Sequence, residues 1–221
     1  MLRSANLSPA WYSGPKKDVQ LKPGHDREII CMAVQGDKVV TGGSDHSLRE
    51  YDLKGGRMIR ELFTQRYGHS EWVTSCDYTP EGRILSGGMD SQLCLWDSRI
   101  TRCESLLSHK SSISKVKVDE KNIGMASSYD GTISIWDLKQ HDCIQTLGSA
   151  KSKSPLMDFD WVNSLAVTGS RDGQLGVWDI NKGKCIKTAR AHQGPISKVS
   201  LYSDSVNQHL IMSCGIEDGV L

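Results

Sequence analysis

Short runs of alternating apolar and polar residues, separated by turn-forming residues, make up most of this chain. In the first clear example, the runs "REIICMAV", "KVVTGG", "SLREYDL" and "RMIRELF" are separated by "QGD", "SDH" and "KGG". A period of two residues is typical of strands, and turn dipeptides between such runs favour tight hairpins. The pattern predicts four short antiparallel strands, and "PEGR", "YDGT", "RDGQ" and "NKGK" repeat its turns downstream. Because no stretch has a convincing amphipathic helical period, the predicted fold class is all-β.

The same unit of four runs recurs along the chain. Each copy carries an aromatic residue followed by Asp, and these aromatic residues are Tyr51, Trp96, Trp136 and Trp178, spaced by 45, 40 and 42 residues. An Asp precedes each aromatic residue by six positions, and seven positions after it lies Met58, Cys103, Cys143 or Cys185. A four-stranded repeat of about 40–45 residues has the period of a β-propeller blade. Since Met replaces Cys in one copy, we expect an apolar packing position there and not a metal ligand.

Histidines precede the repeats and complete a recognisable pattern. Gly24-His25, Gly68-His69, Ser108-His109 and Ala191-His192 each lead into a copy. Gly-His followed after roughly two dozen residues by Trp-Asp resembles the signature of the WD-repeat β-propeller family. The resemblance implies a β-propeller of four-stranded antiparallel blades over residues 18–221, after a flexible segment at 1–17. The expected repeats cover about 18–64, 65–106, 107–147, 148–189 and an incomplete 190–221.

Four full repeats and most of a fifth are fewer than the seven blades usual in the family. The resemblance therefore implies a partial or truncated propeller, with five-bladed closure or association with other chains as the alternatives. "DVQLK" before His25 has the pattern of a lone fourth strand. In this family such a strand typically completes the final blade.

The resemblance also implies a hydrogen-bonded chain within each blade, from Asp to His to Ser or Thr to Trp. The second repeat has all four residues, His69, Ser86, Asp90 and Trp96. The other repeats each lack one member: Tyr51 replaces Trp, Ala126 replaces the hydroxyl, and Ser152 stands near the expected His. Each lost link is expected to cost about 1–3 kcal/mol if its partner stays buried. A hydrolase triad of Ser, His and Asp is the competing interpretation, but a set that recurs once per repeat indicates architecture.

Composition narrows the function classes. The chain has 221 residues, 38% of them hydrophobic and 24% charged, with a net charge of +1 that does not favour a nucleic-acid partner. It has no apolar run of about 18 residues that could span a membrane and no signal-peptide pattern at its start. The predicted setting is therefore intracellular, cytoplasmic or nuclear. Seven cysteines without a Cys-x-x-Cys pair argue against a disulfide framework or a zinc knuckle, and we expect no cofactor and no metal.

The sequence predicts a non-catalytic scaffold for protein–protein interaction. The Asp that lies six positions before each aromatic residue is called the turn Asp below. In this family the residue before the turn Asp, and residues near the start of the first strand, tend to face one surface. The candidate partner-binding residues there are Trp72, Met89, Tyr129 and Arg171, since Trp, Tyr and Arg are common interface anchors. An alternative starts from Trp96-Asp97-Ser98-Arg99, which resembles the box through which WD-repeat substrate receptors contact a cullin ubiquitin ligase adaptor. A catalytic propeller is the remote alternative.

Overall fold

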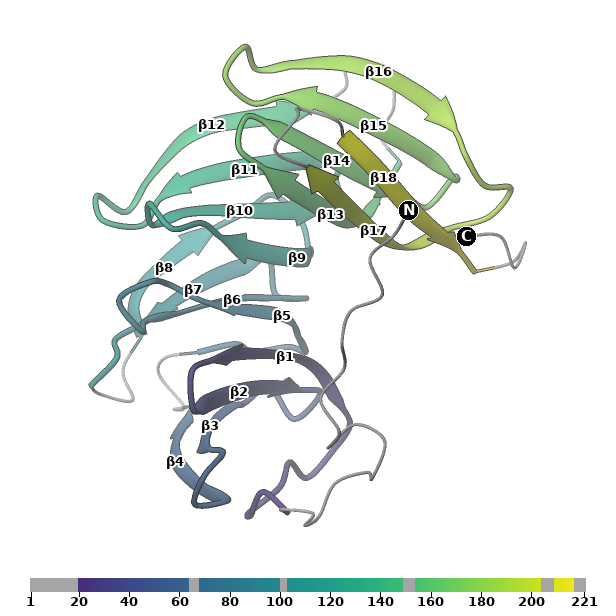
Figure 1. The fold of residues 1–221 in the computed structure, drawn as a ribbon. Coiled ribbons are helices and arrows are strands. Elements are labelled where there is room, and N and C mark those ends of the chain that lie inside the picture. The colour runs from purple at the N-terminus through teal and green to yellow at the C-terminus, as the bar shows by residue number, and fades with distance from the viewer. Residues whose placement is uncertain (1–19, 64–67, 100–102, 149–153, 204–208, 217–221) are drawn as a thin grey trace, which may run out of the picture.

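The computed structural model describes residues 20–63, 68–99, 103–148, 154–203 and 209–216. These residues form eighteen strands in five separate antiparallel sheets (Figure 1). We call the sheets blades 1 to 5 in chain order. Within these ranges there is no helix, and so none that is long and apolar enough to cross a membrane.

The first four blades each have four strands paired in sequence order. Blades 1 and 2 contain β1 (Ile29–Gln35), β2 (Lys38–Gly43), β3 (Leu48–Asp52), β4 (Arg57–Leu62), β5 (Val73–Tyr78), β6 (Ile84–Gly88), β7 (Gln92–Trp96) and β8 (Cys103–Ser108). Blades 3 and 4 contain β9 (Ile113–Val118), β10 (Ile123–Ser128), β11 (Thr132–Asp137), β12 (Asp142–Gly148), β13 (Leu156–Val162), β14 (Leu165–Ser170), β15 (Gln174–Asp179) and β16 (Lys184–Arg190). The described part of blade 5 contains β17 (Ile196–Ser203) and β18 (His209–Gly215). This architecture confirms the all-β fold of four-stranded antiparallel sheets.

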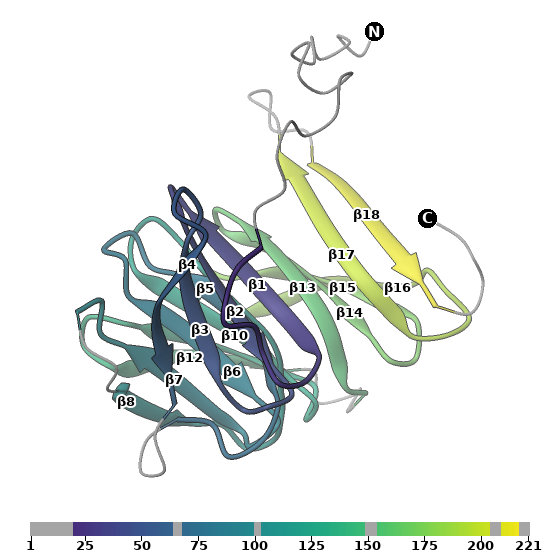
Figure 2. The same ribbon diagram turned by 90° about the horizontal axis from the view of Figure 1, so that it is seen from below.

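The five blades form an open arc, with blade 1 at one end and blade 5 at the other (Figures 1 and 2). Their first strands, β1, β5, β9, β13 and β17, line a shared hollow of about 640 Å³. No strand pairing within the described ranges joins blade 5 to blade 1.

Apolar side chains fill the junctions between successive blades. Trp96 of blade 2, for example, is fully buried in a cluster with Leu48 and Leu62 of blade 1. Phe159 and Trp161 of blade 4 pack in the same way with Ile133 of blade 3. Burial of apolar area contributes roughly 25 cal/mol per Å². Each blade is therefore stabilised mainly by its neighbours, as in other stacked repeats.

Two sequence-based expectations are wrong. Lys22, in the expected lone fourth strand, instead forms an isolated parallel bridge to Arg57 of β4 within blade 1. The predicted apolar packing position in the fourth strands is buried at Cys103, but Cys143 and Cys185 are exposed. The outer strands β12 and β16 are largely exposed, and β16 is exposed at every residue, so none of the described residues covers these thiols.

Candidate functional site: the blade networks and the turn face

Blade 2 contains a continuous chain of hydrogen-bonded side chains. The Trp96 indole Nε1 donates to Ser86 Oγ at 2.9 Å, Ser86 Oγ lies 2.8 Å from His69 Nε2, and His69 Nδ1 lies 3.0 Å from Asp90 Oδ1. An indole can only donate and a carboxylate can only accept, so the hydrogen bonds run in one direction along the chain, from Trp96 through Ser86 and His69 to Asp90. The Nδ1–H of His69 donates to Asp90, which fixes the orientation of the imidazole ring. Ser86 and His69 are buried, and the hydroxyl is not presented to solvent as a nucleophile.

The carboxylate at the end of this chain is held ionised. Burial alone would raise the pKa of Asp90, but the hydrogen bond and charge of His69 lower it. The backbone N–H groups of Ser70 and Gln92 also donate to Asp90, at 2.9 and 3.1 Å. Together these donors hold the pKa below its ordinary value. The network thus fixes the turn between β6 and β7 as well as the strand packing.

Blades 1 and 5 keep the histidine part of the network. His25 lies 2.9 Å from Asp45 and 2.8 Å from Thr41, and His192 lies 2.8 Å from Ser213. Tyr51, which replaces Trp in blade 1, donates its hydroxyl to the Pro23 carbonyl at 2.8 Å. The aromatic position in blade 1 therefore ties down the chain that enters the blade.

Blade 3 departs from the expected pattern. Ala126 offers no hydroxyl, but the Trp136 indole is not left unpaired, because it donates to Ser134 Oγ on its own strand at 2.8 Å. The unpaired group is instead on His109, whose Nδ1 lies 3.8 Å from Asp130 and has no hydrogen-bond partner among the described residues. Burial lowers the pKa of His109, and the nearby Asp130 charge only partly opposes this.

A glycine two residues before the turn Asp decides whether histidine and Asp can meet. A Cβ atom at Gly88 would lie 2.5 Å from His69 Nδ1, and one at Gly43 would lie 2.7 Å from His25 Nδ1. Blade 3 has Ser128 at this position, where His109 stands away from Asp130. The choice of Gly or Ser at this position is visible in the sequence, but its effect on the contact between histidine and Asp is visible only in the structure.

Blade 4 has no histidine and shows the converse arrangement. Its glycine position is Ser170, whose hydroxyl is hydrogen-bonded to the Asp172 carboxylate. Trp178 still donates to Thr168 Oγ1, at 3.0 Å. Ser152, near the expected histidine position, lies outside the described residues. The serine hydroxyl therefore takes over the role of the imidazole toward the turn Asp.

One backbone hydrogen bond recurs at the turn face, by which we mean the edge of the blades where second strands end and third strands begin. The N–H of Met89 donates to the Trp72 carbonyl at 2.9 Å, and that of Tyr129 donates to the Ser112 carbonyl at 3.0 Å. The N–H of Arg171 makes the equivalent bond in blade 4. Because the bond is the same in each blade, the four candidate partner-binding residues lie on the same face of the arc.

The turn face is continuous between blades 2 and 3. Ser112 Oγ donates to the Met89 carbonyl at 2.8 Å, which joins the Met89 turn to the neighbouring blade. Trp72 is 47% exposed despite its apolar ring, and Arg171 is also exposed. Met89 and Tyr129 are half-buried. The face therefore presents the exposed ring of Trp72 and the exposed guanidinium of Arg171, whereas Met89 and Tyr129 are partly packed.

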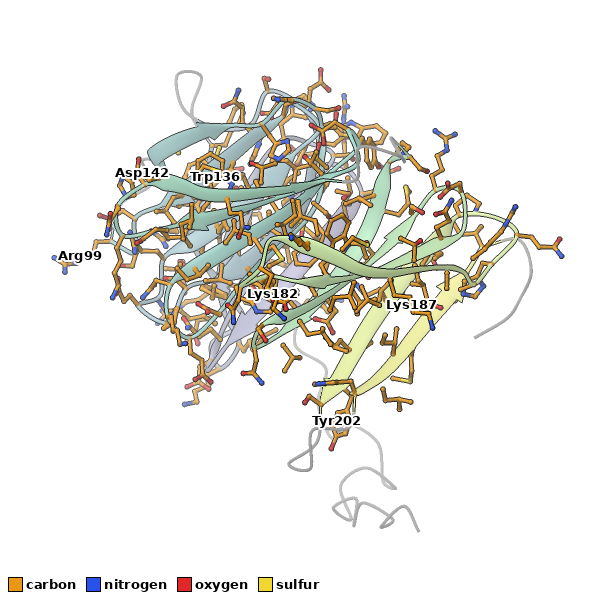
Figure 3. The ribbon with its side chains drawn as sticks, turned by 90° about the horizontal axis from the view of Figure 1, so that it is seen from above. Arg99, Trp136, Asp142, Lys182, Lys187 and Tyr202 are labelled. Carbon is orange, nitrogen blue, oxygen red and sulfur yellow. The ribbon has the colours of Figure 1, made fainter. Side chains whose placement is uncertain are left out.

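Arg99 lies at the opposite edge of the blades, past the end of β7. It is exposed and points away from the ribbon (Figure 3). Its N–H donates to Asp97 Oδ1 at 2.6 Å. A shallow hollow of about 600 Å³ there is lined by Glu81, Arg83, Asp97, Ser98, Arg99 and Lys139. Arg99 and the turn-face residues consequently cannot belong to one contact patch.

Within the described part of the chain, no group of three His, Cys, Asp or Glu side chains could hold a metal ion. The polar residues are instead distributed once per blade. A repeated four-stranded antiparallel sheet with an internal Trp, Ser or Thr, His and Asp network defines the class of β-propeller repeat proteins.

Comparison with known proteins agrees with this class. The family model described as "WD domain, G-beta repeat" matches residues 60–97 and 101–137. The chain is 29% identical to Protein tipD of Dictyostelium discoideum over 137 residues, and 29% identical to Autophagy-related protein 16 of Arabidopsis thaliana over 140 residues. Each match covers 60% of this chain. A guanine nucleotide-binding protein subunit beta-like protein of Encephalitozoon cuniculi is 26% identical over 98 residues, or 42% of this chain.

The chain contains WD repeats, matched by the family model and by these relatives, and no subfamily is assigned. The matches cover 22% of tipD, 26% of Autophagy-related protein 16 and 29% of the beta-like protein. The chain thus spans well under a third of the length of these relatives.

Proposed function

We propose that this protein is a non-catalytic scaffold that binds a partner protein through the turn face. The recurring backbone hydrogen bond supports this, because Met89, Tyr129 and Arg171 are its donors in blades 2, 3 and 4, and Trp72 is the acceptor in blade 2. These four side chains differ from blade to blade, whereas the network residues beneath them repeat. A rigid frame that carries non-repeating aromatic and cationic side chains suits selective protein recognition.

The test is quantitative affinity purification with the triple variant Trp72→Ala, Tyr129→Ala, Arg171→Ala. We expect its partner to be depleted by about tenfold or more, the effect of losing about 1.4 kcal/mol of binding free energy. The matched control replaces three exposed residues of the outer strands, Ile144→Ala, Ile186→Ala and Lys187→Ala. Equal partner recovery with both variants, while both retain the wild-type melting temperature, would exclude the turn face.

A second candidate function is that of a substrate receptor that contacts a cullin ubiquitin ligase adaptor through Arg99. Its support is the exposure of Arg99 together with the cations Arg83 and Lys139 around the same hollow. Arg99→Ala should abolish capture of the adaptor, and Lys54→Ala, an exposed cation on blade 1, should leave it unchanged. Capture that survives Arg99→Ala would end this alternative.

A further inference from the structure

Two thiols meet where blade 1 packs against blade 2. Cys31 Sγ of β1 lies 3.5 Å from Cys76 Sγ of β5. Cys31 is half-buried and Cys76 is buried, and both line the hollow enclosed by the five first strands. All seven cysteines are in the free thiol form.

The other junctions show what normally occupies this position. By strand register, Cys31 corresponds to Ser75, Lys115 and Asp158 in the next three blades. Ser75 Oγ donates to the Val116 carbonyl at 3.4 Å, Lys115 Nζ donates to the Phe159 carbonyl at 2.7 Å, and Asp158 Oδ2 accepts from the Val199 N–H at 2.7 Å.

Val116, Phe159 and Val199 are in turn the register equivalents of Cys76. Three junctions therefore carry a polar contact from this side chain to the backbone of the next blade. At the first junction Cys31 Sγ also lies 3.8 Å from a backbone carbonyl of the next blade, that of Val73, but here the side chain additionally meets a second thiol.

We propose that Cys31 and Cys76 form a redox-active dithiol that a hydroperoxide converts to a disulfide between blades 1 and 2. The Cys31 thiolate attacks one peroxide oxygen, so that an S–O bond forms, the O–O bond breaks, and the leaving oxygen departs as water. The Cys76 sulfur then attacks the Cys31 sulfur, so that the S–S bond forms and the S–O bond breaks, and a second water carries away the Cys76 proton. The two thiols supply two electrons, and one hydrogen peroxide becomes two waters.

The order of attack follows from the surroundings. The hydrogen bond with Cys31, together with burial, raises the pKa of Cys76, so Cys76 keeps its proton until its sulfur attacks the Cys31 sulfenic acid and the proton passes to the departing oxygen. Cys31 is the more exposed thiol and meets the oxidant from the hollow.

Closing the pair to a disulfide of about 2.05 Å requires the two sulfur atoms to approach by roughly 1.5 Å. The opposite side of β1 is not held by packing among the described residues, because Met32 is 71% exposed and Val34 is 58% exposed. Both positions are filled by packed side chains in the later blades.

The test treats the reduced protein with graded hydrogen peroxide and analyses it by intact mass and non-reducing peptide mapping. We expect a loss of about 2 Da and one dominant cross-link, Cys31–Cys76, which dithiothreitol reverses. Cys94→Ser should leave the cross-link unchanged, since Cys94 and Cys103 form the other close thiol pair but are both buried.

The single variants keep the proposal falsifiable. Cys31→Ser should lose the cross-link, and Cys76→Ser should instead accumulate a Cys31 sulfenic acid that dimedone traps. The oxidised wild type should also melt at a higher temperature, because the bond closes a loop over a sequence separation of 45 residues. Preferential formation of any other cross-link, or over-oxidation of Cys31 without a disulfide in the wild type, would overturn the proposal.

Discussion

Single residues decide how completely the hydrogen-bond network of each blade forms. The glycine two residues before the turn Asp is the clearest case. Gly88→Ser should lower the free energy of unfolding by about 1–3 kcal/mol, because the new Cβ displaces His69 from Asp90 and leaves buried polar atoms unpaired. Urea denaturation measures this change. Gly24→Ser is the matched control, since no atom lies within 4 Å of a Cβ there. Equal stability of the two variants would refute the close-approach explanation.

Blade 3 offers the reverse experiment. The double variant Ala126→Ser, Ser128→Gly restores the hydroxyl and removes the Cβ that stands where histidine approaches Asp. We expect His109 to move into hydrogen-bond contact with Asp130 and the protein to gain about 1 kcal/mol of stability. Titration by NMR should show the pKa of His109 rising from its lowered value. An unchanged pKa would mean that Ser128 does not cause the separation.

The lowered pKa of His109 also predicts how stability depends on pH. A group whose pKa is lower in the folded protein contributes stability that is complete above its unfolded value and is lost as pH falls. For His109 the ordinary value is 6.5, so stability should decrease as the pH falls below about 6.5. Thermal melts from pH 8 to pH 5 measure this slope. His109→Gln should flatten it, and a slope that persists unchanged would assign it to other groups.

At the scale of elements, side chains of the first strands connect each blade to the next. Asp158 of β13 is 3% exposed, pairs with Lys115 at 2.7 Å and accepts the Val199 N–H of β17. Asp158→Ala should cost about 1–3 kcal/mol, because it leaves the buried Val199 N–H without its acceptor and takes the carboxylate away from the half-buried Lys115. Hydrogen exchange should show lost protection in β17 and retained protection in β1 to β4, since repeats depend on their nearest neighbours.

Lys198→Ala is the control for this element-scale prediction. Lys198 also approaches Asp158, at 3.7 Å, but its side chain is largely exposed and its loss should cost at most about 1 kcal/mol. Uniform loss of protection over all five blades in Asp158→Ala would show that the arc unfolds as one unit.

Periodicity predicts the elements of this fold well, because alternation, turn dipeptides and the recurring aromatic–Asp pair are local signals. Contacts between blades are less predictable, because they join residues about 40 apart in sequence that share no local pattern. Cys31 and Cys76 meet because the Cys31 side chain points from β1 toward blade 2 and the Cys76 side chain points from β5 toward blade 1. The pairing of Trp136 with Ser134 shows a further limit, since a missing partner was replaced from the same strand.

For the whole molecule, five blades in an arc give a rigid frame with a distinct turn face on one edge. The network residues predicted for blade 2 lie inside the blade, whereas the candidate contact residues lie at its surface. This separation is why the repeat defines the family but does not define the partner.

Site-specific photo-crosslinking tests the claim that partners bind the turn face most directly. A benzophenone amino acid placed at position 72 should cross-link to the partner under conditions in which the same group at the exposed position 186 of β16 does not. Cross-linking from position 186 and none from position 72 would contradict the account.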